Sequence, residues 1–313
     1  MSNEKCNQKN ILSIDGGGIK GIFAASFLSE IEKKCCIKIC DYFDMISGTS
    51  TGAIIAAALS IGIPAEKIFQ LYRYKANKIF PSHTFFKIFR GKYKTNELKQ
   101  ALQDVFGEKK IRDCQTRLLI PAYNLVTRKV QVFKTPHAED LYYDYNLLLL
   151  DVILSSTAAP IYFSPYEMPA GVFIDGGVGA NNPSFIAVAE GLTRCHWQPE
   201  NINVLSIGNV GTEVETTGKE KMGLIDALTI QKCFMAAESQ YAENLCNIFL
   251  NKKNILRIDY NSIHGQVSLD KVNDYTINTL RTWGVQEAQK YVHTIQEKFL
   301  SRKKEDIKFY NII

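Results

Sequence analysis

Short apolar runs and longer segments of helical periodicity alternate along the first two thirds of this chain. The apolar runs at 11–14 and 43–47 each lead into a glycine-rich turn, a pattern typical of buried strands. Four further strands complete the predicted set: 118–122, 129–134, 172–174 and, last in the chain, 203–207. Because buried strands that alternate with helices build a largely parallel sheet with both faces covered, the pattern predicts an α/β fold.

The helical segments are recognised by their apolar faces. After the first glycine-rich turn, one such face comprises Ile19, Ile22, Phe23, Phe27, Leu28 and Ile31. Helices are also predicted at 53–60, at 147–155 and from about Pro183, a residue favoured in a first helical turn. The final 80 residues are predicted to be mostly helical.

The length of 313 residues allows either two domains or one large α/β domain. We expect one domain, with a polar tail at 1–10, a core at 11–210 and a mostly helical part at 211–313. The tail carries no apolar run of signal-peptide length, and no segment approaches roughly 20 clean apolar residues. We therefore expect no signal peptide and no transmembrane helix, and hence a cytoplasmic protein.

Composition excludes some classes of protein. Hydrophobic residues make up 46% of the chain and charged residues 22%, which excludes a disordered chain or a fibrous repeat. The net charge of +5 is too small to indicate a nucleic-acid binder. Eight cysteines are too few for a disulfide scaffold. The cluster of Cys35, Cys36 and Cys40 lacks the paired spacing of a zinc site, so we expect no metal there.

The turn after the second predicted strand is the first candidate for chemistry. Gly48-Thr49-Ser50-Thr51-Gly52 matches G-x-S-x-G, the nucleophile elbow. The two glycines permit a sharp strand-to-helix turn that exposes the Ser50 hydroxyl, and the following helix directs its positive end toward the reacting carbonyl. An ordinary Gly/Ser/Thr turn is the alternative interpretation, and the predicted strand and helix on either side favour the elbow.

The turn after the first predicted strand reads Asp15-Gly16-Gly17-Gly18-Ile19-Lys20-Gly21. Three adjacent glycines before a helix expose consecutive backbone N–H groups that suit an anion, either a phosphate or the oxyanion of a tetrahedral intermediate. The spacing also fits the dinucleotide fingerprint G-x-G-x-x-G. That fingerprint expects an acidic residue after the second strand, where this chain has the serine elbow instead.

A nucleophilic serine needs a base to accept its proton. Asp175-Gly176-Gly177 follows a predicted strand, and its glycines let another group approach the carboxylate. The alternative is a solvated turn aspartate, the commonest reason for an Asp-Gly pair. None of the five histidines, at 83, 137, 196, 264 and 293, sits in a context that marks a base. Asp175 is therefore the better candidate.

These three motifs, in this order, resemble the patatin-like phospholipase family. The similarity extends over about 11–210 and includes the Ser-Ser-Thr-Ala-Ala-Pro segment at 155–160, Asn181-Asn182-Pro183 and the Leu-Ser-Ile-Gly segment at 205–208. The family usually carries arginine where this chain has Lys20, and lysine lacks the bidentate fork. This departure bears on one cationic contact and leaves the serine and aspartate motifs intact.

The resemblance implies a three-layer α/β/α fold with extra helices and a Ser–Asp dyad formed by Ser50 and Asp175. It implies an oxyanion hole built from the backbone N–H groups of Gly16, Gly17 and Gly18. The supporting motif residues are Asp15, Lys20, Gly21, Gly48, Gly52, Gly176 and Gly177. The implied activity is hydrolysis of fatty-acyl esters of membrane phospholipids through an acyl-enzyme, with no metal and no cofactor.

One segment has the composition of a membrane contact. Residues 72–94 hold seven lysines or arginines, seven aromatics and no acid, whereas the rest of the chain has 30 basic and 32 acidic residues. The aromatics are Tyr72, Tyr74, Phe80, Phe85, Phe86, Phe89 and Tyr93. We expect a lid or a peripheral membrane-docking segment, with cations on anionic headgroups. The alternatives are a folded connection with its aromatics in the core, and base stacking without a recognised nucleic-acid module.

Two other functions stay open at this point. An α/β-hydrolase-type esterase with a Ser-His-Asp triad would place its elbow later in the chain and supply a histidine near the end. A non-catalytic binding protein would keep the fold and lose the chemistry, although both dyad positions are present here.

Some prokaryotic patatin-like enzymes resemble this compact layout and serve as antiviral defence effectors switched on by a cyclic nucleotide or an oligonucleotide, so a cyclic nucleotide is a candidate activator.

Overall fold

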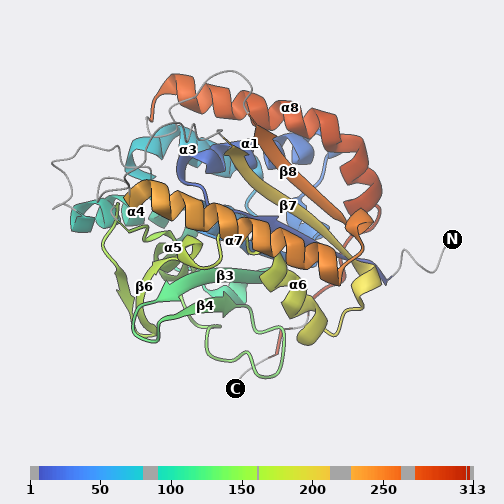
Figure 1. Cartoon of the computed structure of the whole chain (residues 1–313), viewed down its shortest axis with the longest axis horizontal. Helices are drawn as coiled ribbons and strands as arrows, with labels where there is room; N and C mark the ends of the chain where they lie inside the picture. Colours follow the sequence, from blue (N-terminus) through green and yellow to red (C-terminus); the bar gives the residue numbers. More distant parts are fainter. Residues whose placement is uncertain are drawn as a thin grey trace.

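The computed structural model describes residues 7–79, 91–160, 162–211, 227–261, 272–307 and 309–310. Its strands are β1 (Lys9–Ile14), β2 (Met45–Gly48), β3 (Arg117–Asn124), β4 (Lys129–Lys134), β5 (Tyr166–Met168), β6 (Gly171–Asp175), β7 (Ile202–Gly211) and β8 (Ile255–Asn261). Within the described residues they form one sheet in the order β5-β6-β3-β2-β1-β7-β8, and β4 pairs with β3 outside that path (Figure 1).

The centre of the sheet is parallel. β1 pairs in parallel with β2 and β7, β2 pairs in parallel with β3, and β7 with β8. At one edge, β4 and β6 run antiparallel to β3, and β5 runs antiparallel to β6. The predicted α/β fold with a largely parallel sheet is confirmed.

The prediction that 203–207 is the last strand is wrong, because β8 follows it. In β8 the apolar residues Leu256, Ile258 and Tyr260 alternate with Arg257 and Asp259. A strand that carries charges on one face resembles an exposed loop when only apolar runs are counted. The short strand β5 was not predicted either.

The helices are α1 (Gly21–Cys35), α2 (Thr51–Ser60), α3 (Ala65–Ile79), α4 (Gly91–Phe106), α5 (Leu149–Thr157), α6 (Ser184–Thr193), α7 (Ala227–Phe249) and α8 (Asp274–Phe299). In Figure 1, α6 and α7 lie in front of the sheet, and α1, α3 and α8 lie on its other side. Neighbouring residues of β1 confirm three layers, because Ile11 packs in the core beneath α6 whereas Leu12 packs in the core beneath α1. The central strands are therefore buried on both faces.

The structure shows that some residues of 72–94 cannot contact a membrane. Tyr72 lies in α3, is fully buried, and donates a hydrogen bond from its hydroxyl to the Thr51 carbonyl at 3.0 Å. Its placement in a membrane surface is therefore wrong, since it belongs to the core. Lys75 forms an ion pair with Asp104 at 2.6 Å. Tyr74 is 76% exposed. The remaining aromatic side chains, those of Phe80, Phe85, Phe86, Phe89 and Tyr93, lie outside the described part of the structure.

In the part of the chain that the structure describes, every helix is too short or too polar to cross a bilayer.

Helices α1 and α8 pack with their backbones in close approach. At Gly284 in α8, a Cβ atom would lie 2.5 Å from the carbonyl oxygen of Phe23 and 3.0 Å from the backbone nitrogen of Phe27. Both of these atoms belong to the backbone of α1 and cannot turn aside as a side chain could. The glycine is therefore explained by the contact between the two helices.

Gly284→Ala is expected to destabilise the protein by about 1–3 kcal/mol, because the added methyl group forces the two helices apart. The sign is informative, since alanine in place of glycine normally stabilises a helix interior by about 0.8–1 kcal/mol. Urea unfolding at equilibrium measures the difference. The exposed position Gln286 in the same helix supplies the control, and Gln286→Ala should be close to neutral. A Gly284→Ala protein as stable as the wild type would contradict the close approach.

Candidate active site

Ser50 sits at a strained turn between β2 and α2. Its backbone has φ 56° and ψ −122°, a conformation that L-residues with side chains rarely adopt. A Cβ at Gly48 would collide with the backbone of Gly52, and a Cβ at Gly52 would collide with the carbonyl of Ile14. Both glycines of the G-x-S-x-G motif are thus required by space. Helix α2 begins at Thr51, two residues earlier than predicted, and its amino terminus adjoins Ser50.

Asp175, the last residue of β6, meets Ser50. The Ser50 hydroxyl donates a hydrogen bond to Oδ2 of Asp175 at 2.6 Å, and the backbone N–H of Gly177 donates to Oδ1 at 2.7 Å. β6 runs antiparallel to β3, so Ser50 and Asp175 do not meet at the carboxyl ends of neighbouring parallel strands. Asp175 reaches Ser50 because β6 ends opposite Ala122, before the end of β3. The structure thus brings together two residues that lie 125 positions apart in the chain.

Burial sets the electrostatics of this pair. Ser50 is 8% exposed and Asp175 is 4% exposed. Burial raises the pKa of Asp175 to about 6, against the opposing effect of the hydrogen bonds from Ser50 and Gly177. The carboxylate is therefore ionised at neutral pH and has a higher proton affinity than a solvated aspartate. Both properties suit a group that accepts a proton from a hydroxyl.

Three hydrogen bonds tie the elbow to α5, β3 and the segment before α6. The backbone N–H of Ser50 donates to Oγ of Ser156 in α5 at 3.0 Å, and that hydroxyl donates to the carbonyl of Pro121 at 2.7 Å. The Thr49 hydroxyl donates to the carbonyl of Ala180 at 2.7 Å. Sequence reasoning gave Ser156 no role. Its position in the 155–160 segment was the available signal, and its partner could not be inferred without the fold.

The glycine-rich turn lies against Ser50, since a Cβ at Gly16 would be 3.2 Å from the Ser50 Cβ. The N–H of Gly16 donates to the carbonyl of Asn181 at 3.0 Å and is thereby engaged. Of the three N–H groups expected at the oxyanion, those of Gly17 and Gly18 make no hydrogen bond to another described residue. Gly18 has φ 57°, which favours glycine. The geometry therefore points to two donors in this turn.

The other predicted motif residues have packing roles. The N–H of Lys20 donates to the Gly17 carbonyl and closes the turn that leads into α1. A Cβ at Gly21 would lie 3.1 Å from the Thr51 Cβ, so this glycine lets α1 approach α2. A Cβ at Gly176 would collide with the carbonyl of Pro121. These residues therefore support the loops that carry the site.

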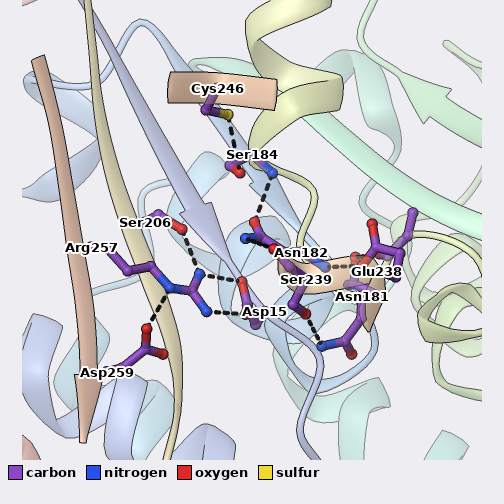
Figure 2. A network of polar contacts seen from close by, with 12 residues as sticks. Asp15, Asn181, Asn182, Ser184, Ser206, Glu238, Ser239, Cys246, Arg257 and Asp259 are labelled. Atoms are coloured by element: carbon purple, nitrogen blue, oxygen red, sulfur yellow. Dashed lines mark hydrogen bonds and ion pairs between the residues drawn. The ribbon is translucent and has the colours of Figure 1, made fainter. Parts of the chain in front are cut away.

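Asp15 does not contact Ser50 in the described interactions and instead forms a buried ion pair with Arg257 of β8 (Figure 2). Helix α7 forms hydrogen bonds with Asn181 and Asn182, which precede α6. Its Glu238 accepts a hydrogen bond from the N–H of Asn182 at 2.9 Å, and its Ser239 hydroxyl accepts one from the Asn181 side chain at 3.0 Å. Sequence reasoning missed Arg257, Glu238 and Ser239, because no motif marks them in the C-terminal part, which was expected to be mostly helical and for which β8 was not predicted.

Residues 12–188 match the family model described as patatin-like phospholipase. The chain belongs to the patatin-like phospholipase family. It is 32% identical over 322 residues to the cGAMP-activated phospholipase of Vibrio cholerae, an alignment that covers 90% of this chain and 91% of that protein. It is 30% identical over 300 residues to the cGAMP-activated phospholipase of Pseudomonas aeruginosa, covering 90% and 88%.

Among solved structures, the chain resembles that of VipD from Legionella pneumophila. The TM-score is 0.49 at 14% sequence identity, and the match covers 92% of this chain and 67% of that one.

As a patatin-like phospholipase, the protein is an enzyme, a serine-dependent lipid acyl hydrolase. The family and the named relatives agree with the predicted lipid acyl hydrolase rather than with the triad esterase or the non-catalytic binding protein. In the described part of the chain, no histidine forms a hydrogen bond with Ser50 or Asp175, so none is placed as the base of a triad. His137 is a buried core residue, held by Glu190 at 3.1 Å and Thr135 at 2.9 Å, and burial lowers its pKa.

Two adjacent serines of α5 test how the patatin elbow is held. Ser156→Ala would leave the buried N–H of Ser50 without its acceptor and is expected to cost about 1–3 kcal/mol of stability. Ser155 is equally buried, but its hydroxyl donates to the Asp151 carbonyl and leaves no N–H unpaired when removed. Urea unfolding should therefore rank Ser156→Ala well below Ser155→Ala. Equal losses would show that the bond to Ser50 contributes nothing.

Proposed function

We propose that Ser50 and Asp175 are the catalytic dyad of a phospholipase that releases fatty acids from membrane phospholipids through an acyl-enzyme. The observation that carries this proposal is the hydrogen bond of 2.6 Å from the Ser50 hydroxyl to a buried carboxylate, at an elbow with a positive φ. Membership of a family of lipid hydrolases supplies the substrate class.

The proposed reaction proceeds in two halves. Asp175 accepts the Ser50 proton as Oγ attacks the ester carbonyl, and the N–H groups of Gly17 and Gly18 stabilise the oxyanion. The tetrahedral intermediate collapses, Asp175 returns the proton to the leaving alkoxide, and the acyl group stays on Ser50. Asp175 then deprotonates a water molecule that attacks the acyl-enzyme. The fatty acid leaves and Ser50 regains its proton.

Contact with the membrane is proposed to be peripheral and to involve the exposed part of 72–94. In the described portion of that stretch, Arg73 and Tyr74 are exposed, and the guanidinium carbon of Arg73 lies 5.8 Å from the centre of the Tyr74 ring. An aromatic side chain beside a cation suits the interface of an anionic membrane. Tyr72 and Lys75 are excluded from this role because they are engaged inside the protein.

Activation by cGAMP is proposed from the names of the relatives in Vibrio cholerae and Pseudomonas aeruginosa. Those relatives align over about nine tenths of both chains, so the similarity includes most of the C-terminal third. A phospholipase that acts on the membrane of its own cell requires restraint. We propose that the nucleotide removes this restraint and that the enzyme serves antiviral defence by attacking the membrane.

The first test is fatty-acid release from mixed anionic liposomes, with and without cGAMP. Wild-type enzyme should release fatty acid when cGAMP is present, and Ser50→Ala or Asp175→Asn should lose at least about 10³-fold in rate while remaining folded. Linear dinucleotides serve as the ligand control, and Ser155→Ala serves as the protein control. Near-normal rates in either dyad variant would refute the dyad. Full release without nucleotide would refute the gating and leave the dyad standing.

The pH dependence follows from the buried carboxylate. Asp175 accepts a proton only when ionised, so kcat/KM should rise about tenfold per pH unit below pH 6 and level off above it. A soluble nitrophenyl ester separates this effect from changes in the liposome. Burial also raises the pKa of Asp15 to about 6, so the profile should be repeated in Asp15→Asn, where the same inflection should persist at a lower rate. A flat profile between pH 4.5 and 8 would contradict the role of Asp175.

A further inference from the structure

A side chain from the sheet edge holds the residue that opens the glycine-rich turn. Arg257 of β8 extends past β7 to Asp15, which lies between the end of β1 and Gly16 (Figure 2). Nη1 donates to Oδ1 at 3.0 Å and Nη2 donates to Oδ2 at 2.6 Å. The pair is bidentate, so it fixes the orientation of the carboxylate as well as its position.

The guanidinium is itself fixed. Its Nε donates to Asp259 at 2.8 Å, and Nη1 also donates to the Ser206 hydroxyl at 2.7 Å. Ser206 is the register partner of Arg257 in the pairing of β7 with β8, so both lie at the same level of the sheet. The side chain of Arg257 is 16% exposed and that of Asp15 is 1% exposed. A lysine could supply the charge but not this fork of donors.

Gly208 of β7 makes room for this arrangement. A Cβ at that position would collide with the Asp259 carboxylate and the Arg257 guanidinium. The register of β7 and β8 also shifts between Ile207 and Val210, immediately around this glycine. The glycine in the 205–208 segment, which the proposed function leaves without a role, is therefore explained by the passage of the arginine over the sheet.

The turn is tied on its other sides as well. The N–H of Asp15 donates to the Ile207 carbonyl at 3.0 Å, which extends the ladder between β1 and β7 by one residue. The next N–H, that of Gly16, donates to Asn181. The direction of the following N–H groups, at Gly17 and Gly18, depends on how these two residues are held.

We propose that Arg257 is a positioning residue that aims the N–H groups of Gly17 and Gly18 at the oxyanion by holding Asp15. The proposal rests on the proposed function of the turn. Donors to an oxyanion contribute on the order of 10²–10³ in rate each, and they act only when placed to a fraction of an ångström. Removal of Arg257 leaves a buried carboxylate without its counter-charge, and the turn that follows Asp15 then shifts.

The experiment compares Arg257→Met and Arg257→Lys with Arg302→Met. Arg302 is a matched control, because its side chain is 17% exposed and pairs with buried Asp44 at 3.3 Å, and that carboxylate accepts the N–H of Asn10 at the opposite end of β1. Arg257→Met should lower kcat by about 10–100-fold with KM changed less than about threefold, and Arg257→Lys should fall between it and the wild type. Arg302→Met should keep kcat within about threefold of the wild type.

Two further readouts separate positioning from a general loss of structure. A fatty-acyl trifluoromethyl ketone forms a hemiketal oxyanion on Ser50, so its affinity should fall in Arg257→Met by the same factor as kcat/KM. A non-hydrolysable ether phospholipid forms no oxyanion, and its binding should not change. If Arg257 acts through Asp15, the double variant Asp15→Asn/Arg257→Met should be no slower than the slower single variant.

The inference is overturned if Arg257→Met keeps the wild-type kcat, if ether-lipid affinity falls as much as ketone affinity, or if Arg302→Met loses as much activity. Should Arg257→Met fail to fold, Arg257→Lys is measured with the same ketone and ether-lipid pair, once its thermal unfolding matches that of Arg302→Met, and the same outcomes decide. Failure of the proposed function looks different, since Ser50→Ala would then remain active and wild-type enzyme would not bind the ketone.

Discussion

The hydrogen bond between Ser50 and Asp175 is the constraint on which the rest of this structure depends. Each residue requires a particular local environment. The serine must lie on a strained turn, and the aspartate must be buried enough that its pKa rises toward neutral pH while it remains ionised there. In the sheet, β2 is parallel to β3 and β6 is antiparallel to β3, so the two residues approach each other from strands of opposite direction. β2 delivers the serine from one direction, and β6 brings the aspartate from the other.

Holding these two groups costs free energy, and several elements offset it. A positive φ at a non-glycine residue costs on the order of 1–3 kcal/mol, and a buried carboxylate is also unfavourable. The hydrogen bond from the Ser50 N–H to the Ser156 hydroxyl of α5 offsets part of the cost of the positive φ. The N–H of Gly177 and the Ser50 hydroxyl offset part of the cost of the buried carboxylate. Contacts from α5 and from the turn after β6 therefore help to keep Ser50 and Asp175 in this arrangement.

Glycine explains why much of the site could be predicted from the sequence. Gly48, Gly52 and Gly176 each face a backbone atom that excludes a side chain, so the steric demand determines the residue type at that position. The first strands and helices could likewise be predicted because their apolar patterns are local. Ser156 could not, since a serine in a helix carries no sign of a partner 106 residues away. The engagement of the Gly16 N–H and the burial of Tyr72 depend in the same way on chain segments that meet only after folding.

Polar contacts link the C-terminal third of the chain to the glycine-rich turn beside Ser50. The segment that matches the family model, 12–188, contains Ser50, Asp175 and the glycine-rich turn, yet it does not contain the partner of Asp15. In the folded chain the Asp15 side chain is 1% exposed, and its counter-charge lies outside that segment. β8 supplies the guanidinium and α7 supplies the acceptors for Asn181 and Asn182. The hydrogen-bonded pair of Ser50 and Asp175 thus lies in the first two thirds of the chain, whereas the counter-charge for the turn beside it comes from the last third.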